Sequence, residues 1–285
     1  MFKAFLPRTD LAMESYDPSD QTLPQGVFAE QQILDGVTKT TVIIETDAAA
    51  KRLGRPCGEY ITLEGESSIC GDTLCDLLTE GLEKLLPEGE TLVVGLGNRD
   101  ITPDIIGPAA ASQIMATRHL FSEQLERMGF EELRSVCVIA PGVMGQTGIE
   151  VFDMVKSLTE KYKFTSVIAI DALAARSSER LGKTIQLSNS GISPGSGVLN
   201  RRAELSEKTL GIPVIAIGIP TVVDAATLIY DLCPNCDIAD SKLTMMVTPR
   251  DIDAVSERGA KIIARAVNRA LQPQLTDDEI ALLTS

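Results

Sequence analysis

From about residue 91 onward, short apolar runs alternate with amphipathic segments. The amphipathic segments 105–121 and 149–163 have helical spacing, and the runs between them are rich in Val and Ile, as is typical of buried strands. These strand-like runs are 91–97, 135–140, 166–170 and 214–219. Near-continuous apolar strands separated by helices indicate a parallel sheet that is covered on both faces. We therefore expect a three-layer α/β/α sandwich with a mostly parallel sheet.

The remaining segments have a less regular pattern. Further strands are expected at 39–46, 59–64 and 184–189, and further helices at 73–86, from about Val222, and over 249–271. The last of these helices begins with Pro249 and acidic residues, which are favoured at a helix N-terminus. The chain shows no internal repeat and no low-complexity tract. We expect one α/β domain with an N-terminal edge decoration.

Composition excludes several classes of partner. The 285 residues include 40 acidic and 26 basic side chains, which gives a net charge of −14. Because binding to nucleic acid depends on Lys and Arg, we do not expect direct binding to nucleic acid. The most apolar long window, 211–230, is broken by two prolines, two glycines and Asp224, and the N-terminus lacks the apolar run of a secretion signal. No membrane span is expected, and six scattered cysteines fit a reducing, cytoplasmic compartment.

Two aspartates follow predicted strands at the edge where an open parallel sheet binds ligands. Asp171 directly follows the apolar run 166–170, and Asp104 lies in the turn after 91–97. Two carboxylates within a few ångströms of each other cannot both ionise cheaply, so one would remain an acid while the other acts as a base. Such a pair can activate water, although each aspartate could instead cap a helix or a turn.

Two glycine loops are compared with nucleotide-binding motifs. Segment 95–100 begins as G-x-G but has Asp100 where the third glycine of a dinucleotide motif belongs. Segment 141–150 lies between a strand and a helix but lacks the Lys-Ser/Thr pair of a phosphate loop. Its amides, near Gly142 and Gly145, could still hold an anion or an oxyanion.

A third glycine loop, 191–195, matches G-x-S-x-G formally. Pro194 directly follows Ser193, and the chain's one histidine, His119, lies upstream, so a serine nucleophile is disfavoured. Amides near Gly195 could nevertheless hold an oxyanion. His119 is expected on a helix that begins at the Asp104 turn, either as a half-buried imidazole or in support of that carboxylate.

Seven stretches in fixed order, between residues 8 and about 226, together resemble the germination proteases of spore-forming bacteria. They are RTDLAMES, GLGNRDITPDIIGP, ATRHLF, PGVMGQTGIE, IAIDALAARS, GISPGSGV and TLGIPVIAIGIPTVVDA. The resemblance implies an α/β/α fold similar to that of hydrogenase maturation proteases. It also implies a cytoplasmic endopeptidase of the forespore and spore core that degrades small acid-soluble spore proteins at germination.

The resemblance further implies an atypical aspartic peptidase without a cofactor, assembled as a homotetramer and made as a self-cleaving zymogen. The two family carboxylates fall on Asp104 and Asp171. The self-cleavage segment matches RTDLAMES, so the scissile bond is Asp10–Leu11. Residues 1–10 are then a propeptide and residues 11–285 a single peptidase domain.

Recognition of the Asp10 carboxylate requires a cationic or amide-rich pocket. Candidate cations are Arg176, Arg201 and Arg202.

Two departures from the family pattern leave alternatives open. The segment 231–243 is short and holds the C-x-x-C of Cys233 and Cys236, a loop feature or a redox pair, in place of a sizeable insertion in longer relatives. Similar hydrogenase-processing enzymes use a metal, so a metal bridging Asp104 and Asp171, with or without His119, is the first alternative. A non-catalytic module that binds a small anion is the second.

Overall fold

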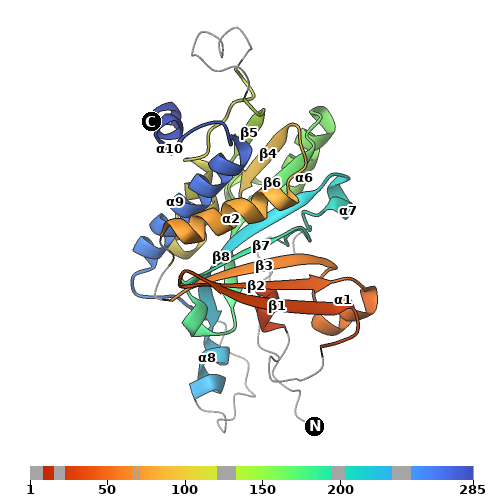
Figure 1. Ribbon diagram of the computed structural model, residues 1–285, viewed down its shortest axis with the longest axis vertical. Helices are drawn as coiled ribbons and strands as arrows, with labels where there is room; N and C mark the ends of the chain where they lie inside the picture. Colours follow the sequence, from red (N-terminus) through yellow and green to blue (C-terminus); the bar gives the residue numbers. More distant parts are fainter. Residues whose placement is uncertain are drawn as a thin grey trace.

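A central mixed sheet is the core of the protein (Figure 1). The computed structural model describes residues 9–15, 23–66, 69, 71–120, 133–193, 203–232 and 245–284. The strand order is β1-β2-β3-β7-β8-β6-β4-β5, with β9 paired to β8. The strands are β1 (Val27–Leu34), β2 (Val37–Ile44), β3 (Gly58–Gly65), β4 (Thr91–Gly95), β5 (Val136–Ile139), β6 (Ser166–Ala175), β7 (Thr184–Ser188), β8 (Val214–Asp224) and β9 (Met246–Val247).

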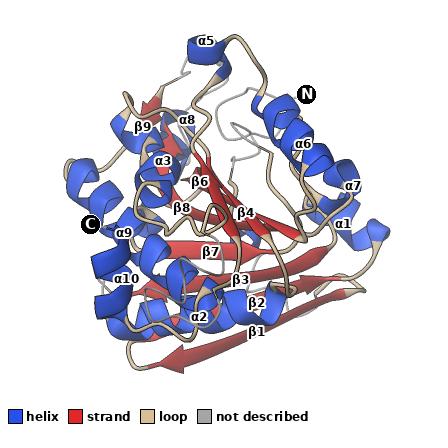
Figure 2. Ribbon diagram, turned by 90° about the horizontal axis from the view of Figure 1, so that it is seen from above, coloured by secondary structure: helices blue, strands red, loops and turns tan. Residues whose placement is uncertain are grey.

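Helices cover both faces of this sheet, which confirms the expected α/β/α architecture (Figure 2). The helices are α1 (Asp47–Leu53), α2 (Asp72–Leu85), α3 (Ile106–Ala111), α5 (Met144–Thr147), α6 (Val151–Lys161), α7 (Glu207–Leu210), α8 (Ala225–Leu232), α9 (Ile252–Leu271) and α10 (Asp277–Thr284), with 3₁₀ turns η1 (Ala12–Glu14), η2 (Thr102–Asp104) and η3 (Ser178–Arg180). No described helix combines the length and the apolar character that a membrane crossing requires.

The sheet is parallel in one half only. Strands β5, β4, β6 and β8 are parallel neighbours, whereas β7, β3, β2 and β1 are added antiparallel. The expectation of a mostly parallel sheet therefore holds for the first group and is wrong for the second. Residues 176–183, which join β6 to β7, are too few for a parallel crossover, and Asp35-Gly36 closes β1 and β2 as a hairpin with positive φ at both residues.

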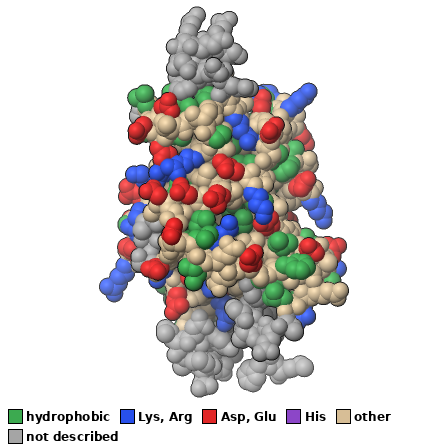
Figure 3. All heavy atoms as spheres, viewed as in Figure 1, with side chains coloured by type: hydrophobic (Ala, Val, Ile, Leu, Met, Phe, Trp, Pro, Cys, Tyr) green, Lys and Arg blue, Asp and Glu red, His purple; other side chains and the backbone are tan. Residues whose placement is uncertain are grey.

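The alternation of side chains along the strands divides the core into two layers. Ile168 and Ile170 of β6 belong to the core under α2, α3 and α9, whereas Val167 and Ala169 face the core under α6. Helix α1 packs at the far end of the second face, against Val42, Ile44 and Tyr60. On the face of the molecule shown in Figure 3, acidic and basic side chains are interspersed.

Three predicted boundaries that bear on the site are wrong. The helix expected over 105–121 ends at Ala111, because the buried Asn268 of α9 accepts a hydrogen bond from Met115 N (2.9 Å) and donates one to Gln113 O (3.0 Å). Strand β6 does not end before Asp171 but continues to Ala175, because β8 pairs with it over this whole length. Strand β8 itself runs to Asp224, so the helix expected from Val222 begins three residues later.

Candidate active site

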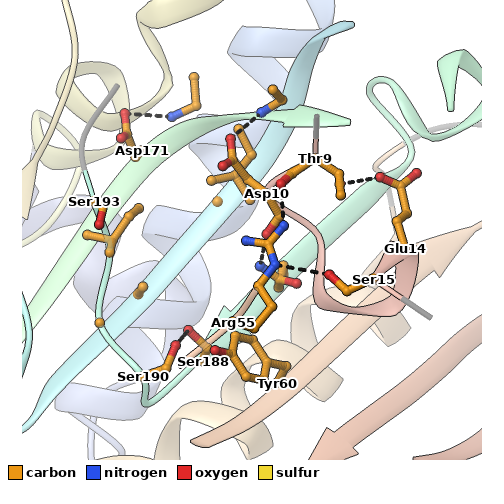
Figure 4. Close-up of a pocket in the computed structure, with 18 of the residues that line it drawn as sticks. Thr9, Asp10, Glu14, Ser15, Arg55, Tyr60, Asp171, Ser188, Ser190 and Ser193 are labelled. Carbon is orange, nitrogen blue, oxygen red and sulfur yellow. Dashed lines mark hydrogen bonds between the residues drawn. The ribbon is translucent and has the colours of Figure 1, made fainter. Parts of the chain in front are cut away.

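A cavity of about 1090 Å³ lies on the α6 face of the sheet (Figure 4). Residues from η2, β6, β7 and β8 line it, together with the N-terminal segment 9–15 and the turn 190–193. Asp104 and Asp171 both line this cavity. The expectation that the fold brings these two aspartates to one place agrees with this geometry.

Asp104 is positioned by close backbone packing after β4. Its Oδ2 accepts a hydrogen bond from Asn98 N (2.8 Å), and Gly97 (φ +115°) lies so close that an added Cβ would stand 2.1 Å from Asp104 O. Thr221 Oγ1 of β8 donates to Pro103 O (2.7 Å). The turn that carries Asp104 is thereby fixed against the sheet.

Asp171 lies inside β6 and not at its end. Strand β4 stops at Gly95, which pairs with Ile170, so Asp171 is the first residue of β6 beyond that neighbour. Its side chain is 5% exposed, and Oδ1 accepts a hydrogen bond from Ala172 N (2.9 Å). The carboxylate lies at the carboxyl edge of β4, where the sheet opens into the cavity.

Asp10, the residue before the expected scissile bond, lines the same cavity (Figure 4). Asp10 N donates to Ala174 O (2.7 Å), and Ala174 N donates to Asp10 Oδ2 (2.8 Å), so the segment pairs with β6 three residues beyond Asp171. Leu11 is fully buried against Leu173 and Ala175. The Asp10 carboxylate therefore accepts a hydrogen bond from one backbone N–H of β6.

Further contacts fix the segment on both sides of this bond. On the C-terminal side, the Glu14 carboxylate accepts hydrogen bonds from Arg176 N (2.7 Å) and Ser177 N (3.1 Å) and pairs with Arg180 Nη1 (3.1 Å). Arg55 joins the two sides, because its Nη2 donates to Thr9 O before the bond and its Nε donates to Ser15 Oγ (3.1 Å) after it (Figure 4). Arg176, an expected cationic partner of Asp10, thus contributes its backbone N–H to Glu14.

Gln186 of β7 contacts the same bond and was missed from the sequence. Its Nε2 donates to Asp10 O (2.9 Å), and its Oε1 accepts from Ala12 N (2.7 Å). The alternating polar and apolar residues of Thr184–Ser188 gave no signal, because they suggest a strand with one exposed face, whereas all five residues are buried. Burial also raises the pKa of Tyr60, whose neutral hydroxyl lies in the cavity and donates to Pro56 O (2.8 Å).

His119 lies away from the aspartate pair, in an exposed turn and not on a helix. The N–H groups of Thr117 and Arg118, just before it, donate to Val136 O, and Val136 pairs with Thr91 at the amino end of β4. Because the aspartates lie beyond the carboxyl end of β4, the length of this strand separates His119 from them.

Gly142 lies just before α5 and Gly145 lies within it, and neither lines the large cavity. Gly142 lines a second, smaller cavity with Asp100 and Gln146. Gly195, Arg201, Arg202, Cys233 and Cys236 lie outside the described residues. Within the described ranges, no group of three or more His, Cys, Asp or Glu side chains is arranged to hold a metal ion.

Comparison with known proteins identifies the family. A family model described as germination protease matches residues 8–234. The chain is 39% identical to the germination protease of Clostridium perfringens (strain ATCC 13124), with 96% of this chain and 97% of the relative covered. It is 38% identical to that of Caldanaerobacter subterraneus subsp. tengcongensis (96% and 96% covered) and 36% identical to that of Bacillus cereus (strain ATCC 10987; 97% and 96% covered).

Among solved structures, the chain is similar to the NiFe hydrogenase maturation protease HycI from Thermococcus kodakarensis KOD1. The TM-score is 0.37 at 16% identity, and the match covers 66% of this chain and 98% of that chain. The family match and the full-length relatives settle the assignment. The chain belongs to the germination protease family and is a peptidase of spore germination.

Proposed function

We propose that the protein is an endopeptidase that initiates degradation of small acid-soluble spore proteins during germination. Asp104 and Asp171 activate the attacking water, and no cofactor takes part. The chain is made as a zymogen that cuts itself between Asp10 and Leu11, so residues 1–10 are a propeptide and residues 11–285 form the peptidase domain. It acts as a homotetramer in the cytoplasm of the forespore and in the spore core.

One observation supports this proposal above the others. Asp10, the residue before the proposed scissile bond, lines the cavity that both aspartates line, and its segment pairs with β6 three residues beyond Asp171. A self-cleavage site must share a cavity with the catalytic groups of its own chain, and Asp10 meets this requirement.

The chemistry follows from two acids in one cavity. The ionised carboxylate takes a proton from water, and the water oxygen attacks the carbonyl carbon of Asp10. The protonated carboxyl then donates its proton to the leaving nitrogen of Leu11. Two neighbouring carboxyl groups supply both roles, because mutual repulsion keeps one protonated while the other is ionised.

The first test uses a spore protein as substrate. Wild-type and variant chains are produced to begin at Leu11, because the variants should not process themselves. Each is incubated with a purified small acid-soluble spore protein, whose fragments are followed by mass spectrometry. The Asp104→Asn and Asp171→Asn variants should each lose activity by about 10²–10⁴-fold or more, the usual contribution of a general acid or base. Asp100→Asn is the matched control, because Asp100 lies four residues before Asp104 but binds Gln146 outside the large cavity.

The outcomes separate the alternatives. Full activity of either Asn variant at position 104 or 171 contradicts the aspartate mechanism. Activity lost on chelation and restored by Ni²⁺ or Zn²⁺ would support a metal on the same carboxylates. Intact substrate after long incubation with the wild-type enzyme would contradict the peptidase assignment of this site.

A further inference from the structure

We propose that Gln186 is a further catalytic residue, whose carboxamide holds the carbonyl oxygen of the scissile bond and stabilises the negative charge that develops there. This inference rests on the proposed cleavage of Asp10–Leu11. Gln186 Nε2 already donates to Asp10 O at 2.9 Å in the uncleaved chain. Donors at about 2.7–3.1 Å from the developing oxyanion are the geometric mark of an oxyanion hole.

The sheet register places Gln186 opposite Asp171. Gln186 pairs with Gly218, and Gly218 pairs with Asp171, so the three residues form one row across β7, β8 and β6. Residues in one row point to the same face, and strands are about 4.8 Å apart, so the outer two backbones are roughly 10 Å apart. The side chains of Gln186 and Asp171 thus emerge on the same face of the sheet, one on each side of Gly218.

The side chain of Leu173 packs on Gly218 in the middle of this row. An added Cβ at Gly218 would stand 2.4 Å from Leu173 Cγ, and Leu173 packs against the buried Leu11. The residue after the scissile bond therefore lies directly beside the row that joins Gln186 to Asp171. Gln186 therefore contacts the bond directly, and Asp171 stands on the same face of the sheet at the other end of the row.

The orientation of the Gln186 amide is fixed by its second contact. Gln186 is 8% exposed, and its Oε1 accepts a hydrogen bond from Ala12 N at 2.7 Å. With its oxygen engaged, the carboxamide presents N–H, the donor that a carbonyl oxygen requires. One side chain thus holds the peptide on both sides of the scissile bond.

This contact strengthens as the reaction proceeds. When the water oxygen bonds to the Asp10 carbonyl carbon, the π electrons of the C=O bond move to the oxygen, which becomes negative and binds the Gln186 N–H more tightly. When the C=O bond re-forms, the bond to the Leu11 nitrogen breaks, and that nitrogen takes its proton from the carboxyl pair. Removing one such donor typically slows the chemical step by about 10²–10³-fold.

Two substitutions separate the two roles of the amide. Gln186→Glu keeps an oxygen that accepts from Ala12 N but has no N–H for Asp10 O, whereas Gln186→Met is similar in length and loses both contacts. Gln31→Glu, on the exposed face of β1, introduces the same charge far from the cavity as a control. Intact-mass spectrometry gives the rate at which each full chain yields a product beginning at Leu11, and circular dichroism confirms folding.

Hydrogen exchange provides the readout that a purely structural role would not give. Exchange of residues 9–15 is measured in the Asp171→Asn background, in which the chain should stay uncut. We expect Gln186→Glu to slow processing about 10²–10³-fold with the segment still protected, and Gln186→Met to lose both processing and protection. Gln31→Glu should match the wild type.

The result that overturns the role of Gln186 alone is processing of Gln186→Glu at the wild-type rate while Asp171→Asn remains uncut. The proposal is also overturned if Gln186→Glu and Gln186→Met lose protection of residues 9–15 equally. Gln186 would then only hold the segment in place. A wild-type chain that never yields the Leu11 product would overturn the proposed self-cleavage and this inference together.

Discussion

Gly107 packs closely against the backbone that precedes Asp171 in β6. It lies in α3, three residues after Asp104, and an added Cβ would stand 2.1 Å from Leu96 O and 2.4 Å from Ile170 O. Ile170 directly precedes Asp171, and its carbonyl also accepts a hydrogen bond from Leu96 N (2.8 Å). Because backbone atoms cannot move aside as a side-chain end can, the absence of a side chain here allows α3 to pack closely on the strands that lead to the site.

Gly107→Ala should therefore destabilise the protein and disturb the site. We expect a loss of about 1–3 kcal/mol in the free energy of unfolding, the usual cost of overpacking, and slower self-processing. Urea denaturation measures the first effect. Gly145→Ala is the matched control, since an added Cβ at that exposed helical glycine meets no atom within 4 Å. Equal stability of Gly107→Ala and the wild type would show that α3 is free to shift away from β6.

At the scale of elements, α10 is held to α9 by one carboxylate between two arginines. Asp277 Oδ1 accepts from Arg269 Nε (2.7 Å), and Oδ2 accepts from Arg265 Nε (2.9 Å). The hydrogen bond from Arg269 is the largest cause that lowers the pKa of Asp277 to about 2, with a further contribution from Arg265. A carboxyl group whose pKa falls on folding stabilises the folded state above its ordinary pKa, and this contribution is lost as the pH falls through the folded value.

Asp277→Asn should consequently destabilise the protein at neutral pH by about 1 kcal/mol, a small value because the ion pairs are about one-third exposed to solvent. The difference from the wild type should be constant above about pH 4 and should shrink as the pH falls toward 2. Urea denaturation across this range measures it. Asp278→Asn, at the exposed neighbouring position, is the control. A difference that does not change with pH would rule out ionisation as its cause.

Elements whose burial follows a regular period could be predicted from the sequence, and others could not. The apolar runs at β4, β6 and β8 and the helical spacing at α6 are visible because both are set by the core. Strand β1 has one buried residue followed by seven exposed ones, so it lacks any such pattern. The continuation of β6 beyond Asp171 and the early end of α3 depend on β8 and on Asn268, which are remote in sequence.

At the scale of the whole molecule, the site is assembled from segments that only the topology brings together. The positions of Asp104 and Asp171 after predicted strands suggested that they lie close together. The family resemblance implied their catalytic roles and cleavage of the Asp10–Leu11 bond. Neither could reveal Gln186, because its approach to the segment depends on β7 entering antiparallel next to β8. The local sequence predicts individual strands, whereas the contacts around the scissile bond depend on the order of the strands in the sheet.

The most direct test of the central claim follows the mass of the protein itself. Wild type, Asp104→Asn and Asp171→Asn are each purified as the full chain and incubated alone, and intact-mass spectrometry records the masses over time. The account predicts that the wild type loses residues 1–10 to give a chain beginning at Leu11, while both variants keep their full mass. Processing of either variant at the wild-type rate would contradict it.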